Sequence, residues 1–92
     1  MKKERLKSLL NDKILELQKL PYEELCKFID NPRCEEHGEG DNFYQIEIES
    51  FWDDGKRRTK NLRVMVTIDD GGITAFSPLA ESFIVTPDGK LL

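Results

Sequence analysis

The feature that most constrains the fold is the alternating stretch over residues 62–76. Its first half alternates apolar with polar or flexible side chains: Leu62, Val64, Val66 and Ile68 against Arg63, Met65, Thr67 and Asp69. A period of two is expected of a strand with one buried face. Asp70-Gly71 then has the composition of a two-residue type I′ turn. Such a turn would place Ile73 opposite Ile68 and Ala75 opposite Val66. Because turn and pattern agree on one register, the sequence predicts an antiparallel hairpin here.

Two helices are predicted before the sheet. Over residues 1–20, apolar side chains fall within an arc of about 140° on a helix: Leu6, Leu9, Leu10, Ile14, Leu17 and Leu20. Lys13 intrudes on this stripe, although its long side chain can carry the ammonium group to the surface. The stripe predicts a long helix that covers the sheet, with helix-mediated dimerisation as the alternative. A short second helix is predicted over 21–31, since Pro21 suits the first helical position and acids suit the first turn.

The next two segments are predicted as a loop and a strand. Residues 32–42 are polar and acidic and contain two glycines, which predicts an exposed acidic loop. Residues 43–52 alternate again and predict a strand. Asp53-Asp54-Gly55 fits a three-residue hairpin loop with Gly55 in the left-handed region, which would pair Trp52 with Lys56. In this register Trp52 shares a face with Val64 and Val66.

The remaining sequence completes an α+β fold. Ser77-Pro78 interrupts the sheet because proline lacks the N–H that a central strand needs. Residues 79–82 are predicted as a bend or one helical turn, and Phe83–Val85 as a strand. A turn over 86–90 then returns Leu91-Leu92 against Ile84 and Val85. The sequence predicts one domain over 1–92: an N-terminal amphipathic helix and a short second helix packed on a three- to four-stranded antiparallel β-meander over 43–92.

A family resemblance follows from this order of segments. The run Leu20-Pro21-Tyr22-Glu23-Glu24-Leu25, a dense hairpin sheet and the closing Phe83-Ile84-Val85-Thr86-Pro87-Asp88-Gly89 resemble small bacterial domains of unknown function. The resemblance covers most of the chain and consists of turn and core positions. It implies an α+β fold and no particular site or activity.

Composition narrows the functional classes. No apolar run approaches the roughly 18 residues of a membrane span, and charged residues, not an apolar segment, follow Met1-Lys2-Lys3. The two cysteines are therefore interpreted as reduced thiols, and a cytoplasmic protein without membrane association is expected. The net charge is −4. It is unevenly spread, because residues 21–54 hold eleven acids against two bases, and residues 55–68 hold five bases and no acid.

Catalytic and metal chemistry are weakly supported. Cys26, Cys34 and His37 have the spacing C-x₇-C-x₂-H, whereas zinc sites usually begin with two cysteines two to four residues apart. A metal site and a Cys26–Cys34 disulfide remain alternatives to unlinked thiols. Glu47 and Glu49 point to one strand face and could act as an acid–base pair, but a solvated face is the simpler interpretation. No catalytic residue, metal or cofactor is predicted, and the interpretation leans away from an enzyme.

Two surfaces remain as candidate binding sites. The basic run Lys56, Arg57, Arg58, Lys60 and Arg63 could contact phosphates, with Phe51 and Trp52 as stacking groups. The acidic sequence pI of about 5.0 counts against nucleic acid as the main partner.

The second candidate is the sheet face opposite the long helix. The predicted registers align Phe43, Met65 and Phe76 across three strands of this face, beside Glu47 and Glu49. Covering by the chain itself is the alternative to binding. Because methionine and aromatic residues are enriched at interface cores, the leading hypothesis is a non-catalytic protein-interaction module: an adaptor, regulator or inhibitor with a protein partner, or a homodimer. The alternative is a nucleic-acid-binding accessory protein that uses the basic run.

Overall fold

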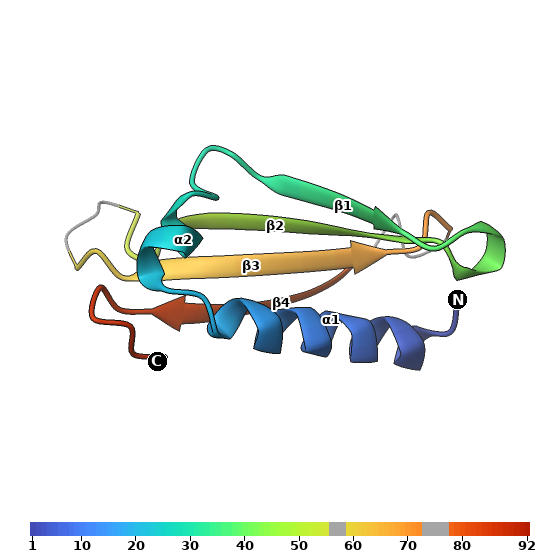
Figure 1. Ribbon diagram of the computed structural model, residues 1–92, viewed down its shortest axis with the longest axis horizontal. Helices are drawn as coiled ribbons and strands as arrows, with labels where there is room; N and C mark the ends of the chain where they lie inside the picture. The colour runs from blue at the N-terminus through green and yellow to red at the C-terminus, as the bar shows by residue number, and fades with distance from the viewer. Residues whose placement is uncertain (56–58, 73–77) are drawn as a thin grey trace.

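The computed structural model of the chain describes residues 1–55, 59–72 and 78–92 (Figure 1). Its helices are α1 (Lys3–Gln18) and α2 (Tyr22–Cys26), with a short 3₁₀ turn η1 (Gly40–Asn42). Its strands are β1 (Arg33–His37), β2 (Tyr44–Trp52), β3 (Leu62–Asp69) and β4 (Leu79–Val85). The four strands form one antiparallel meander in the order β1-β2-β3-β4. The predicted α+β fold, with one long and one short helix on an antiparallel sheet, is confirmed.

One core lies between the helices and one face of the sheet. α1 contributes Leu6, Leu10 and Leu17, and α2 contributes Leu25. The sheet contributes alternate residues of its strands: Ile46, Ile48, Leu62, Val64, Val66, Ile68, Phe83 and Val85. Because all of these side chains belong to one cluster, both helices cover the same face. α1 thus covers the sheet, as the apolar stripe predicted.

The register between β2 and β3 differs from the predicted one. Trp52 pairs with Leu62 and Ile46 with Ile68, whereas the three-residue turn required Trp52 to face Lys56. The connection between the strands therefore spans 53–61. Gly55 does have a positive φ of 69°, as predicted. The observed register differs from the predicted one by an even number of residues, so every side chain keeps the predicted sheet face. Trp52 therefore lies on the same face as Val64 and Val66, as predicted.

The predicted 62–76 hairpin is wrong in its second half. β3 pairs with β4, so that Ile68 faces Leu79 and Val66 faces Glu81. Residues 73–77, which include Ile73, Ala75 and Phe76, lie outside the described residues. At the turn, the Asp69 carboxylate accepts a hydrogen bond from the Gly71 N–H at 2.9 Å and that of Asp70 accepts one from the Gly72 N–H at 3.0 Å. Aspartates that bond to the backbone two residues on favour a turn without fixing its length.

The predicted loop over 32–42 is also wrong, since it contains β1 and η1. β1 is an outer strand that pairs with β2, with Glu35 facing Ile46 and Cys34 facing Glu47. Its side chains are polar on both faces, so no apolar alternation marked it as a strand. The tight return to β2 depends on Gly38, whose φ is 73° and where a Cβ would lie 2.1 Å from the Asn42 carbonyl oxygen.

The other outer strand, β4, is longer than predicted. It begins at Leu79, so residues 79–82 form part of a strand and not a bend or helical turn. The chain then turns over 86–90 and comes back along β4, where Leu91 forms a bridge with Val85 and the Leu92 N–H donates to the Ile84 carbonyl at 2.9 Å. This return was predicted from the sequence.

Candidate functional site

The sheet face opposite the helices, here called the open face, carries the acidic residues singled out in the sequence. Glu47 and Glu49 of β2 and Met65 of β3 point to it, because their strand neighbours lie in the core under α1 and α2. Both described helices lie on the other side (Figure 1). None of the described side chains on the open face is buried.

The strand registers define which side chains meet on the open face. The rows run Cys34–Glu47–Thr67–Ala80, Glu49–Met65–Ser82, Phe51–Arg63–Ile84 and Glu36–Gln45–Asp69. Phe51, Met65 and Ile84 are the large apolar groups among them, and Phe51 is 37% exposed. An open hollow of about 190 Å³ lies beside Met65 and is lined also by Ala80, Glu81 and Ser82. Ile84 was not considered for this face, although its alternation with the predicted core residues of 83–85 already placed it there.

The open face is acidic. It carries Glu36, Glu47, Glu49 and Asp69. Among the described strand residues that point to this face, Arg63 is the only basic one. The Arg63 guanidinium is engaged: its Nε and Nη2 donate to Asp53 at 3.2 and 3.0 Å, and its Nη1 donates to Ser82 at 3.0 Å. The amide of Gln45 donates to both oxygens of Asp69. Negative charge therefore lies next to a partly exposed apolar group of side chains, from the Glu49–Met65 row to the Glu36–Gln45–Asp69 row.

The predicted Phe43–Met65–Phe76 row is wrong in its neighbours of Met65, and Phe76 itself lies outside the described residues. Met65 pairs with Glu49 on one side and Ser82 on the other. Phe43 lies six residues from Glu49 along the chain, a distance of about 20 Å on a strand. Its ring packs instead beside Gly71, where a Cβ would lie 3.8 Å from a ring carbon. The misplacement of Phe43 follows from the wrong register between β2 and β3.

The basic run is only partly described. Lys56, Arg57 and Arg58 lie outside the described residues. Lys60 is exposed and close to α2, because its carbonyl accepts a hydrogen bond from the Tyr22 hydroxyl at 2.6 Å. Arg63 is bound to Asp53, as above. Lys60 and Arg63, the two described basic residues of the run, therefore lie in different surroundings: Lys60 beside α2 and Arg63 against Asp53.

A charge cluster lies at the other side of the sheet, between α1 and β1. The Glu35 carboxylate lies 3.0 Å from Lys13 Nζ, 3.0 Å from Arg33 Nε and 3.1 Å from His37 Nε2. The Lys13 and Glu35 side chains are only 12% and 13% exposed. The His37 ring stacks on Tyr44, with centroids 5.1 Å apart. Lys13, which interrupts the apolar stripe of α1, thus pairs with Glu35, a residue of the segment 32–42 that was predicted to be a loop.

The cluster shifts the pKa of both half-buried partners, Lys13 and Glu35. For Glu35, burial acts to raise the pKa, but the hydrogen bonds from His37 and Lys13 and the nearby positive charges outweigh it, so the pKa lies below its ordinary value. For Lys13, burial acts to lower the pKa, but the bonds to Glu35 and Glu16 outweigh it, so the pKa lies above its ordinary value. Both shifts favour the charged forms of Lys13 and Glu35, as expected of an ion pair that stabilises the fold.

The residues considered for metal binding are not brought together. Cys34 lies on the open face and His37 on the helix face, since they stand at odd spacing on one strand. Both cysteines are free thiols, so the Cys26–Cys34 disulfide is absent. Within the described part of the chain, no group of three or more His, Cys, Asp or Glu residues is arranged to hold a metal ion. His37 contacts Glu35 in the arrangement of a carboxylate–imidazole pair, but in the described residues no hydroxyl or thiol is hydrogen-bonded to its ring.

Comparison with known proteins gives no relative: the chain matches no family model, no curated protein and no solved structure. The function is therefore inferred from the chain's own residues. Across residues 1–55, 59–72 and 78–92, no helix is long and apolar enough to cross a membrane.

Proposed function

We propose that the protein is a small cytoplasmic, non-catalytic interaction module, an adaptor, regulator or inhibitor, whose open face binds a basic segment of another protein. The observation that carries this proposal is the combination, on a face that neither α1 nor α2 covers, of partly exposed Phe51, Met65 and Ile84 with a neighbouring group of carboxylates. Interfaces typically join an apolar centre to a polar rim, and large apolar side chains supply most of their binding energy.

The charge of the open face favours a basic partner over a second copy. A symmetric dimer through this face would bring each copy's Glu47 and Glu49 against the same acidic surface of the other. Like charges facing each other disfavour association, whereas complementary charge speeds the encounter of two proteins and suppresses wrong partners. A lysine- or arginine-rich segment with intervening apolar residues fits both properties of the face.

The two groups of residues have separate roles in this proposal. Met65, next to the hollow lined by Ala80 and Ser82, and its neighbours supply the apolar contact that slows dissociation. Glu47 and Glu49, on the neighbouring strand β2, supply attraction at longer range and make association sensitive to salt.

The proposal is tested by selecting binders from a random dodecapeptide display library on the wild-type protein and on the Glu47→Lys/Glu49→Lys variant. We expect peptides in which Lys or Arg alternates with apolar residues to be enriched on the wild type and lost on the variant. The matched control is Asp12→Lys/Glu23→Lys, which changes the net charge equally but alters exposed acids of the two helices.

The control protein should select the same peptides as the wild type. Chemical-shift mapping with a selected synthetic peptide should then perturb Met65, Ser82 and Ile84. Basic peptides that bind the open-face variant as well as the wild type, or that perturb only helix residues, would refute the proposal.

A further inference from the structure

A second depression lies where α2 and the residues after it meet the end of β2 and Lys60. It has a volume of about 500 Å³ and is lined by Tyr22, Cys26, Ile29, Asp30, Trp52 and Lys60. Ligand pockets in proteins commonly measure about 300–1,000 Å³, so this volume suits a small molecule. The depression belongs to the helix side of the sheet, because Trp52 pairs with Leu62 of the core, and it is separate from the open face.

The lining combines an apolar wall with two opposite charges. Trp52, Tyr22 and Ile29 are half-buried and offer ring and aliphatic surface. Asp30 and Lys60 are exposed and supply a carboxylate and an ammonium group. Small-molecule sites are typically apolar with a few polar groups that fix the orientation of the ligand. A lining of ring and aliphatic surface with one acidic and one basic residue complements a ligand with one flat apolar body and both a positive and a negative group.

The backbone supports these two charged residues in an uncommon conformation. Among the described residues, Asp30 (φ 54°) and Lys60 (φ 59°) are the only non-glycine residues with positive φ, and both line the depression. Residues other than glycine seldom adopt this region, and such residues cluster at ligand sites. Each is anchored: the Tyr22 hydroxyl donates to the Lys60 carbonyl, and Ile29, next to Asp30, forms a bridge with Ser50 of β2. The backbone that carries the two charged side chains is therefore held in place before any ligand arrives.

We propose that this depression binds a small aromatic zwitterion of the size of an aromatic amino acid. The aromatic body lies against Trp52 and Ile29, the ligand carboxylate pairs with Lys60, and the ligand ammonium pairs with Asp30. A preorganised site of this kind gains affinity because little ordering is needed on binding. The inference is independent of the proposed protein interaction, since it uses the other side of the sheet.

Binding is measured with L-phenylalanine as the probe. Trp52 is the chain's single tryptophan, so its emission, excited where phenylalanine does not absorb, reports on the depression. We expect a saturable change with L-phenylalanine. Phenethylamine, which lacks the carboxylate, and 3-phenylpropionate, which lacks the ammonium, should each bind at least about tenfold more weakly, the factor expected for one lost charge-assisted hydrogen bond. L-Alanine, which lacks the ring, should give no change.

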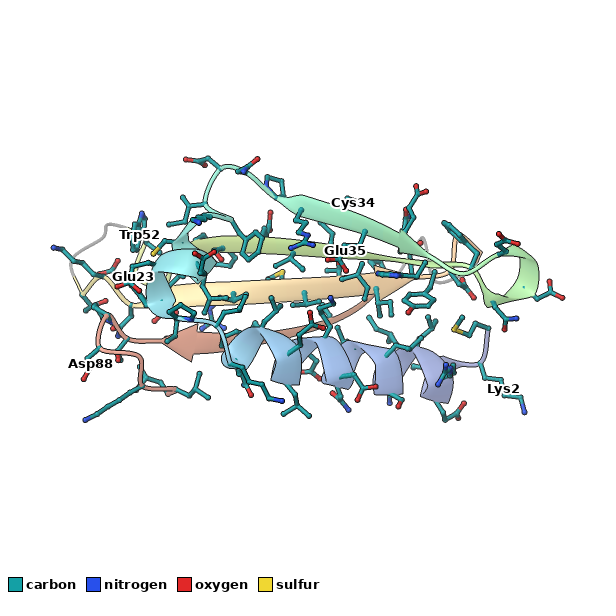
Figure 2. All side chains as sticks on the ribbon, in the orientation of Figure 1. Lys2, Glu23, Cys34, Glu35, Trp52 and Asp88 are labelled. Atoms are coloured by element: carbon teal, nitrogen blue, oxygen red, sulfur yellow. The ribbon has the colours of Figure 1, made fainter. Side chains whose placement is uncertain are left out.

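Two variants remove one charge each without disturbing the backbone. Asp30→Asn and Lys60→Asn introduce the residue that best tolerates positive φ. Each should weaken the binding of L-phenylalanine at least about tenfold. The control Lys2→Asn changes a residue at the opposite end of the long axis from Trp52 (Figure 2) and should bind L-phenylalanine like the wild type. Equal affinity for L-phenylalanine, phenethylamine and 3-phenylpropionate would overturn the proposal, as would an unchanged affinity of Asp30→Asn and Lys60→Asn for L-phenylalanine.

Thiol alkylation gives a second measurement on the unmodified protein. Cys26 lines the depression, while the exposed Cys34 lies on the open face and serves as an internal control. Saturating L-phenylalanine should slow the reaction of Cys26 with iodoacetamide, followed by peptide mass spectrometry, and leave that of Cys34 unchanged. Equal rates for Cys26 with and without the amino acid would contradict binding at this place.

Discussion

Replacing Glu35 by glutamine keeps the shape of the side chain and removes the charge that Lys13, Arg33 and His37 share. The Lys13 ammonium, on a side chain only 12% exposed, would then retain only Glu16, whose carboxylate lies 3.3 Å away. Arg33 would lose much less, because its side chain is 61% exposed. The substitution therefore tests whether the link between α1 and β1 is carried by the half-buried Lys13–Glu35 pair.

The expected cost lies between two known limits. Exposed ion pairs contribute about 0.2–1 kcal/mol, and removing one partner of a fully buried pair costs about 3–5 kcal/mol. Lys13 and Glu35 are neither fully buried nor fully exposed, and Lys13 keeps one partner, so we expect Glu35→Gln to lower the free energy of unfolding by about 1–2 kcal/mol. For a domain of this size, that corresponds to a fall in Tm of about 5–10 °C.

The pH dependence has a definite sign. The pKa of Glu35 in the folded protein lies below its ordinary value of 4.5, so its contribution is present above that value and disappears as the pH falls through the folded pKa. The pKa of Lys13 lies above its ordinary value of 10.5, so its contribution is lost only as the pH rises through its own folded pKa. The difference between wild type and Glu35→Gln should therefore be full at neutral pH and should shrink as the pH falls below 4.5 and through the folded pKa of Glu35.

The assay is urea unfolding followed by Trp52 fluorescence and far-ultraviolet circular dichroism. A double-mutant cycle of Lys13→Met and Glu35→Gln should give a coupling energy of about 1 kcal/mol, while the control cycle of Arg33→Met and Glu35→Gln should give less than about 0.5 kcal/mol. Equal coupling in both cycles, or a Glu35→Gln protein as stable as the wild type, would refute the assignment of this link to Lys13.

Two further predictions concern the core and are checked by the same unfolding assay. Ser50 is buried, and its hydroxyl donates to the Leu25 carbonyl of α2 at 2.8 Å, so Ser50→Ala should cost about 1–2 kcal/mol, whereas the exposed Ser82→Ala should cost less than about 0.5 kcal/mol. Equal costs would mean that the α2–β2 bond contributes nothing. Leu6 is fully buried and Leu15 is 58% exposed on the same helix; Leu6→Ala should cost about 2–5 kcal/mol and Leu15→Ala less than about 0.5 kcal/mol, and a reversed order would place the wrong face of α1 on the sheet.

The parts of the fold that were predictable from sequence are those set by local pattern. The alternation from Leu62 to Ile68 identified β3 and its buried face, and the helical spacing of Leu6, Leu10 and Leu17 identified α1 and its buried side. Gly55 was correctly assigned a positive φ because only the turn chemistry was needed. Each of these inferences uses neighbouring residues alone.

The registers were not predictable in this way, because they depend on pairing between distant residues. In the structure Ile46 faces Ile68 and Ile48 faces Val66, which aligns the apolar residues of β2 and β3 at the cost of a longer connection. Turn rules favour short connections and led to the wrong alignment. The candidate site shared this error, since Met65 was correctly placed on the open face but given Phe43 as its neighbour.

β1 was missed because a polar pair replaces an apolar contact. Glu35 occupies a helix-facing position beside Ile46, where the alternation rule expects an apolar residue. Lys13 gave the available signal: a cation inside an apolar helix stripe is rarely buried without an opposite charge. A search for its partner among the acids of 32–42 would have raised the possibility of a strand there.

The two outer strands of the sheet have a consequence for how this protein behaves at high concentration. An outer strand with free N–H and C=O groups can recruit the same strand of another molecule and start uncontrolled polymerisation. The end of β4 is shielded by the chain's own return, in which Leu91 and Leu92 bond to Val85 and Ile84. β1 is shielded differently: it is five residues long, and charged or ionisable side chains occupy both of its faces. The charges that hide β1 from sequence patterns thus also disfavour pairing of this edge with another copy of the chain in concentrated solutions.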